Sequence, residues 1–72
     1  MPARYTNTSK LSGVTRTIEY SQYTQEEFER RLSSWKQRRV MIQEAFPELS
    51  EDGREFIMTG ITKEEWDKEF GE

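Results

Sequence analysis

The chain contains neither cysteine nor histidine. Without cysteine it can form no disulfide, no thiolate zinc site and no cysteine nucleophile. Without histidine it lacks the side chain that most often acts as a general base near neutral pH, and also the commonest nitrogen ligand for metals. These two absences predict a protein that is not an enzyme and that holds no cofactor or metal.

Long hydrophobic runs are also missing. Only 32% of the residues are hydrophobic and 35% are charged, which gives a mean hydropathy of −1.05. No stretch approaches the ~20 apolar residues that cross a bilayer, and the first residues lack the ~7–15 apolar positions of a signal peptide. We therefore expect no contact with a membrane and a cytoplasmic location.

The length of 72 residues allows one small domain, residues 1–72. A domain of this size buries only about 60% of the surface that its unfolded chain exposes. Each side chain in its core must therefore bury a large apolar surface. Four Phe, three Tyr and two Trp supply that core, since each buries on the order of 150 to 250 Å². A partner or a homo-oligomer would add further buried surface.

The N-terminal part of the chain contains one strand signal. Residues 1–10 are polar and are expected to be flexible, whereas apolar and polar residues alternate from Val14 to Tyr20, which predicts a strand. The turn-forming residues 11–13 could fold Arg4 to Thr8 back onto it. A lone strand and a hairpin therefore remain alternatives.

Two segments have the spacing of a capping box, in which a hydroxyl and a carboxylate satisfy the free amides of a first helical turn. Each box is flanked by an apolar pair with the spacing of a hydrophobic staple. The pattern predicts one helix from Thr24 to about Arg39 and a last helix over Lys63 to Phe70. The boxes are Thr24/Glu27 and Thr62/Glu65, the staples are Tyr23/Phe28 and Ile61/Trp66, and the side chains expected to face the core are Phe28, Leu32, Trp35, Trp66 and Phe70.

Between these helices, the apolar cluster from Val40 to Phe46 either extends the first helix or begins a new one, and Pro47 ends it. Ser50 as an N-cap and Gly60 as a left-handed terminator then predict a further helix. The expected fold is mostly α, with an N-terminal strand or hairpin followed by three or four short helices. A small α+β fold is the alternative.

Paired carboxylates are the only candidates for acid and base catalysis. They occur as Glu26/Glu27, Glu51/Asp52 and Glu64/Glu65. Each pair falls in a predicted first turn, where the helix dipole favours acidic side chains. This structural role explains the pairs without any chemistry.

A cluster of basic residues is the candidate contact site for a partner or a nucleic acid. Five cations within ten residues could neutralise phosphates along one helical face. They could equally cover the apolar stripe with their aliphatic stems and stabilise the C-terminus of the helix. The cluster consists of Arg30, Arg31, Lys36, Arg38 and Arg39.

Charge is divided unevenly along the chain. Residues 1–40 carry eight basic and four acidic side chains, a balance of +4, whereas residues 41–72 carry three and ten, a balance of −7; together these give the net charge of −3. Such a division suits docking on a complementary protein surface, since it steers encounter and fixes orientation. Pairing of the two halves with each other is the alternative.

The C-terminal part of the chain also resembles a group of short uncharacterised proteins encoded by tailed bacteriophages. The resemblance covers about the last 30 residues and implies a shared fold and origin, because its residues are helix caps and apolar anchors. No site residues follow from it. The segments that carry it are Ile42-Gln43-Glu44-Ala45-Phe46-Pro47-Glu48-Leu49-Ser50, Arg54-Glu55-Phe56, Thr59-Gly60-Ile61-Thr62 and Glu64-Glu65-Trp66.

Two functional hypotheses remain. The first is a protein-binding module that occupies a surface of a larger host or phage macromolecule; the resemblance implies an inhibitor of host defence or transcription, or else a virion or replication accessory protein. The second is a small nucleic-acid-binding regulator that uses the basic cluster. The negative net charge and the isoelectric point near 5.0 favour the first.

Overall fold

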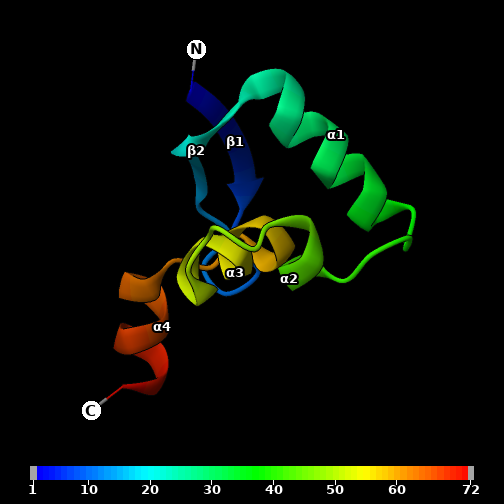
Figure 1. The fold of residues 1–72 in the computed structure, drawn as a ribbon. Helices are drawn as coiled ribbons and strands as arrows, with labels where there is room; N and C mark the ends of the chain where they lie inside the picture. The colour runs from blue at the N-terminus through cyan, green and yellow to red at the C-terminus, as the bar shows by residue number, and fades with distance from the viewer. Residues whose placement is uncertain (1, 72) are drawn as a thin grey trace.

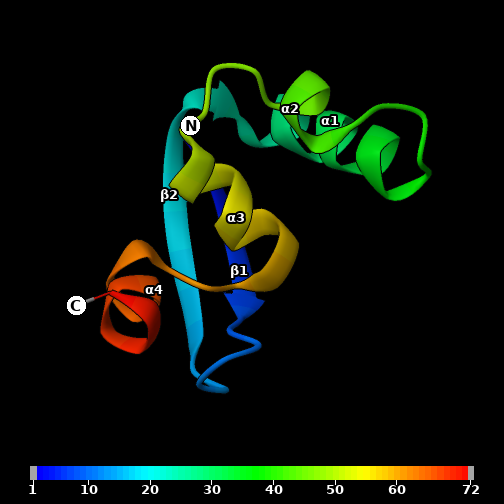
Figure 2. The same cartoon turned by 90° about the horizontal axis from the view of Figure 1, so that it is seen from below.

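The computed structural model describes residues 2–71 as a β-hairpin followed by four helices (Figure 1). The hairpin lies beside α3, while α4 and the end of α1 lie at opposite ends of the molecule in both views (Figures 1 and 2). The elements are β1 (Pro2–Thr8), β2 (Thr15–Thr24), α1 (Gln25–Lys36), α2 (Ile42–Ala45), α3 (Glu51–Thr59) and α4 (Lys63–Phe70).

The prediction of a mostly α fold is wrong. Helices make up 47% of the structure and strands 24%, so the protein is a small α+β fold. The strand content is high because β2 extends from Thr15 to Thr24 and a second strand pairs with it. Pro2–Thr8, within the segment expected to be flexible, form that second strand; Met1 lies outside the described residues.

One face of the hairpin is apolar and the other is polar. Antiparallel pairing places Ala3 opposite Tyr20 and Tyr5 opposite Ile18, and α1 and α3 pack on the hairpin. The packing of these helices stabilises the hairpin, since two strands alone are only marginally stable in water. Val14, with which the predicted strand begins, lies before β2 and is 44% exposed.

The predicted N-caps are confirmed. Thr24, Ser50 and Thr62 each accept a hydrogen bond from an amide in the first turn of α1, α3 and α4, which satisfies donors that a helix start leaves free. The full capping box is present at Thr62 with Glu65. Helix α1 ends at Lys36 rather than near Arg39, and α2 is a separate short helix.

The core is built around the buried ring of Phe28. Its centroid lies 5.0 Å from that of Phe46, 5.2 Å from Tyr20, 5.6 Å from Tyr5 and 6.3 Å from Tyr23. The contact with Tyr23 confirms the predicted staple. Because these rings come from β1, β2, α1 and the residue after α2, one side chain joins four parts of the chain.

Polar side chains fix α3 against the hairpin. Asn7 donates its amide hydrogens to the carbonyl oxygens of Phe56 at 3.0 Å and Ile57 at 3.3 Å, near the C-terminus of α3. Tyr20 donates its hydroxyl to the carbonyl of Gly53 at 3.0 Å. Burial raises the pKa of that hydroxyl, so it remains a donor.

Gly60 is the point of closest approach between α3 and the hairpin. It ends α3 in the predicted left-handed conformation, with φ of 75°. A Cβ atom at this position would lie 2.4 Å from the carbonyl oxygen of Thr8. The amide of Lys10 donates to the carbonyl of Thr59 at 3.1 Å beside it. Only glycine combines this backbone conformation with this contact.

We expect Gly60→Ala to be more destabilising than Gly13→Ala. Both glycines have positive φ, but a Cβ at Gly13 meets no atom within 4 Å. The left-handed backbone costs an L-residue roughly 1–2 kcal/mol at either site, and overpacking at Gly60 adds about 1–3 kcal/mol. Chemical denaturation of the two variants measures the difference. Equal free energies of unfolding would show that α3 does not contact the strand as described.

We also expect Phe28→Ala to unfold the protein, because removing a fully buried phenylalanine costs about 3–5 kcal/mol in a domain with little stability to spare. Trp66→Ala removes a side chain that is 48% exposed and should leave the fold intact. Circular dichroism distinguishes the two outcomes. A folded Phe28→Ala protein, or an unfolded Trp66→Ala protein, would contradict this description of the core.

Candidate functional site

The five predicted basic residues do not form one surface. Arg30 is exposed on α1, and Lys36 is its last residue. Because the helix ends there, Arg38 and Arg39 lie in the connection that follows, where Arg38 has a φ of 60°. Arg31 is separated from the other four because its side chain turns toward the protein.

Arg31 has a structural role that its contacts define. Its guanidinium donates to the carbonyl of Ala45 at 2.9 Å and lies 4.8 Å from the ring centre of Tyr23. It also forms ion pairs, both at 3.8 Å, with Glu27 and Glu48. Arg31 therefore joins α1 to the end of α2 and has few donors left for a partner.

The neighbouring Tyr23 belongs to the same network. Burial raises the pKa of its hydroxyl to about 12, and the hydrogen bond that it donates to Glu48 acts in the same direction. The hydroxyl is therefore protonated throughout the physiological range. This network leaves Arg30, Lys36, Arg38 and Arg39 as the exposed members of the predicted cluster.

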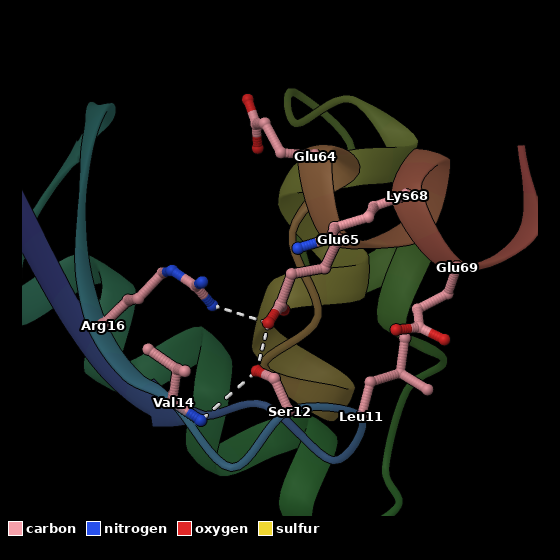
Figure 3. A pocket seen from close by; sticks show the side chains of 8 residues that line it. All are labelled: Leu11, Ser12, Val14, Arg16, Glu64, Glu65, Lys68 and Glu69. Carbon is pink, nitrogen blue, oxygen red and sulfur yellow. Dashed lines mark hydrogen bonds and ion pairs between the residues drawn. The ribbon is translucent and has the colours of Figure 1, made fainter.

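At the other end of the molecule, Glu65 attaches α4 to the turn of the hairpin. Its carboxylate accepts a hydrogen bond from the hydroxyl of Ser12 and forms an ion pair with Arg16 at 3.1 Å (Figure 3). It also accepts the amide of Thr62 at 3.3 Å, which completes the capping box. One carboxylate therefore both begins α4 and holds it against β2.

These contacts lower the pKa of Glu65 to about 2. The hydrogen bond from Ser12 is the largest cause, and Ser9, Arg16 and the amide of Thr62 act in the same direction, while burial opposes them. The carboxylate is therefore ionised at neutral pH. The ion pair with Arg16, which helps to hold α4 on the hairpin, depends on this negative charge.

A hollow of about 320 Å³ lies beside this attachment. Figure 3 shows Leu11 and Val14 on its hairpin side and Glu64, Lys68 and Glu69 on its α4 side. Its walls carry no histidine or cysteine, and its charged groups lie at an open surface. The hollow offers apolar contact area more readily than a catalytic arrangement.

Exposed apolar side chains gather around α4. In the described part of the chain, five large hydrophobic residues are exposed, and four of them lie on the hairpin turn or on α4: Leu11, Val14, Trp66 and Phe70. Trp66 and Phe70 were expected to face the core but are 48% and 61% exposed, and their rings pack on each other with centroids 4.7 Å apart.

The inward orientation predicted for Trp66 and Phe70 is wrong because α4 attaches through a different face. Glu65 binds the hairpin, and residues one and five positions later lie on another side of a helix with 3.6 residues per turn. Helix α4 contains no buried residue. The sequence carried one sign of this, since Trp66 and Phe70 are its only apolar residues. The attachment itself joins positions 53 residues apart, so no local pattern revealed it.

Neither a membrane-spanning helix nor a metal-binding cluster occurs within residues 2–71. No helix there has the length and apolar character to cross a membrane. No group of three or more acidic, histidine or cysteine side chains in that range is arranged to hold a metal ion.

Comparisons with protein-family models, with curated proteins and with solved structures found no match to this chain. The candidate site therefore rests on its own geometry: a short helix, held by one ionised carboxylate, that presents two aromatic rings in tilted contact to solvent.

We expect acid to release α4 from the hairpin. A carboxylate whose pKa is lower in the folded than in the unfolded protein stabilises the fold above the unfolded value. For Glu65 this contribution is lost as the pH falls from about 4.5 toward about 2. Amide chemical shifts of α4, followed by NMR over this range, should change in the wild type.

Two variants test the assignment of this transition to Glu65. Glu65→Gln removes the charge and should show the released shifts already at pH 7. Glu64→Gln removes an exposed first-turn carboxylate next to it and should keep the acid transition. An identical acid response in all three proteins would show that Glu65 does not hold α4.

Proposed function

We propose that this protein is a binding module that occupies a surface of a larger protein, and that Trp66 and Phe70 make the central contact. The observation that supports this proposal is the exposure of these two rings, which lie in tilted contact on a capped helix. Large aromatic side chains in the centre of an interface supply much of its binding energy. Single exposed apolar residues are common, whereas two aromatic rings in contact on one exposed helix face form an apolar surface that a partner can cover.

The attachment of α4 favours this use of the rings. The capping box and the contacts of Glu65 define where the helix starts and how it lies against the hairpin. A helix held in this way presents Trp66 and Phe70 in a fixed relative position, so less entropy is lost when a partner binds. Leu11 and Val14 line a separate hollow, on the side of α4 that carries Glu65.

The wider biological role belongs to the same proposal. We infer a non-enzymatic protein that acts in the cytoplasm by covering its partner. The resemblance of the C-terminal segment to tailed-phage proteins supports a host or phage macromolecule as that partner. Covering a host defence or transcription complex would inhibit it. Alternatively, the protein would use the same surface as a virion or replication accessory protein.

A second candidate function is nucleic-acid binding at the far end of α1. The exposure of Arg30, Lys36, Arg38 and Arg39 favours it, because each cation that contacts a phosphate releases counterions. The net balance of −4 over residues 51–71, from three basic and seven acidic side chains, opposes it. Titration of DNA and RNA at about 50 mM salt tests this alternative, since phosphate binding is strong there.

We expect Trp66→Ala with Phe70→Ala to abolish capture of the partner while the protein stays folded. The tagged protein would be incubated with a lysate of its native host, and bound proteins quantified by mass spectrometry. Truncation of a central aromatic side chain costs about 2–4 kcal/mol of binding free energy, so both truncations together should remove a specific partner from the bound fraction.

Met41→Ala is the matched control. Met41 is 60% exposed and is the fifth of the large exposed hydrophobic residues, but it lies next to α2 rather than α4. Its removal should leave capture unchanged. Capture that survives the double substitution, or that is lost equally in the control, would refute binding through α4.

A further inference from the structure

A second hollow, of about 200 Å³, lies between the N-terminal part of α3 and α4. Three carboxylates from successive turns of α3 line one side of it. The aromatic ring of α4 and the residue before its N-cap line the other, with one lysine at the rim. These residues are Glu51, Asp52, Glu55, Ile61, Lys63 and Trp66.

The carboxylates of this hollow are not balanced by cations of the chain. Among residues 2–71, neither Glu51 nor Asp52 takes part in an ion pair. Glu55 accepts a hydrogen bond from the hydroxyl of Thr59 at 2.7 Å, and this partner is neutral. The hollow therefore combines negative charge with an exposed aromatic face.

The one cation at the rim is already paired. Lys63 donates to Asp67 at 3.1 Å, within α4. Its pKa is raised, first by the hydrogen bond and charge of this partner and then by the charge of Asp52, which lines the same hollow. The surroundings of Trp66 thus remain negative after Lys63 is counted.

We propose that this hollow, the α3–α4 groove, receives an arginine side chain from an extended segment of the partner protein. The inference rests on the proposed function and names the chemistry of that partner. A guanidinium stacks on an aromatic face and donates bidentate hydrogen bonds to carboxylates. The groove offers Trp66 for the first contact and Glu51 with Asp52 for the second.

The apolar and acidic residues of the groove favour this occupant. The aliphatic stem of an arginine would lie along Ile61, which is buried, and Trp66, which is half-exposed. Arginine is preferred over lysine because its planar group is less strongly hydrated and stacks on rings. A phosphate group or an acidic peptide would meet three carboxylates and be repelled.

The test uses the full-length protein and a fluorescently labelled peptide in which two arginines alternate with glycines. Anisotropy at about 50 mM salt, where surface charges are only partly screened, measures the affinity. The same peptide with citrulline in place of arginine keeps the shape and removes the charge. We expect the arginine peptide to bind and the citrulline peptide to bind at least about tenfold more weakly, as expected for a charge-assisted contact.

Two matched double variants locate the contact. Glu51→Gln with Asp52→Asn removes two first-turn carboxylates from the groove, and Glu26→Gln with Glu64→Gln removes two first-turn carboxylates outside it. The net charge of the two proteins is the same. We expect the groove variant to weaken peptide binding about tenfold and the other to leave it within about twofold, because only the first removes direct contacts.

A third variant tests the aromatic wall. Trp66→Leu keeps an apolar side chain but removes the ring, and should weaken the arginine peptide about fivefold through loss of the cation–π contact. Equal weakening by both double variants would identify nonspecific attraction to a negative protein and overturn the proposal. No binding of the arginine peptide, or insensitivity to Trp66→Leu, would also overturn it. So would sedimentation showing that the chain associates with itself through this groove.

Failure of this inference is distinguishable from failure of the proposed function. If the captured partner is lost with Trp66→Ala and Phe70→Ala but retained by Glu51→Gln with Asp52→Asn, the protein binds through α4 and the groove does not receive an arginine. If the partner is retained by both variants, the proposed function fails. Loss with both variants, together with peptide binding, supports both.

Discussion

The packing of aromatic rings around Phe28 is the contact on which the rest of the structure depends. Every ring in this cluster lies within about 6.3 Å of a neighbour, and Tyr5 also meets Phe56 of α3. Each such pair contributes roughly 0.5–1.5 kcal/mol beyond its buried area. A chain with so few apolar residues can fold because nearly all its elements contribute to this one cluster.

Local signals predicted the helices better than the sheet. The hydroxyls of Thr24, Ser50 and Thr62 act within three residues of their own position, so spacing in the sequence is sufficient to identify them. Strand β1 is different, since Pro2–Thr8 contain few apolar residues and become a strand only by pairing with β2. The partner, rather than its own composition, determines its conformation.

The candidate surface was predictable only in part. The sequence indicated a charged, two-sided molecule, and the structure places the end of α1 and the acidic helix α4 at opposite ends (Figure 1). Trp66 and Phe70 looked like core residues because their spacing suits an inward stripe. Their exposure depends on which side of α4 meets the hairpin, and Ser12 and Arg16, distant in sequence, decide that.

Helix α4 contributes no apolar side chain to the core and is attached mainly by polar contacts of Glu65. The hairpin, α1 and α3 share the aromatic cluster, so opening them exposes large apolar surfaces, whereas releasing α4 exposes very little. Local opening of α4 therefore needs much less free energy than global unfolding. Trp66 and Phe70, which are proposed to face a partner, lie in this segment, and binding there would slow the exchange of amide hydrogens over Lys63–Phe70.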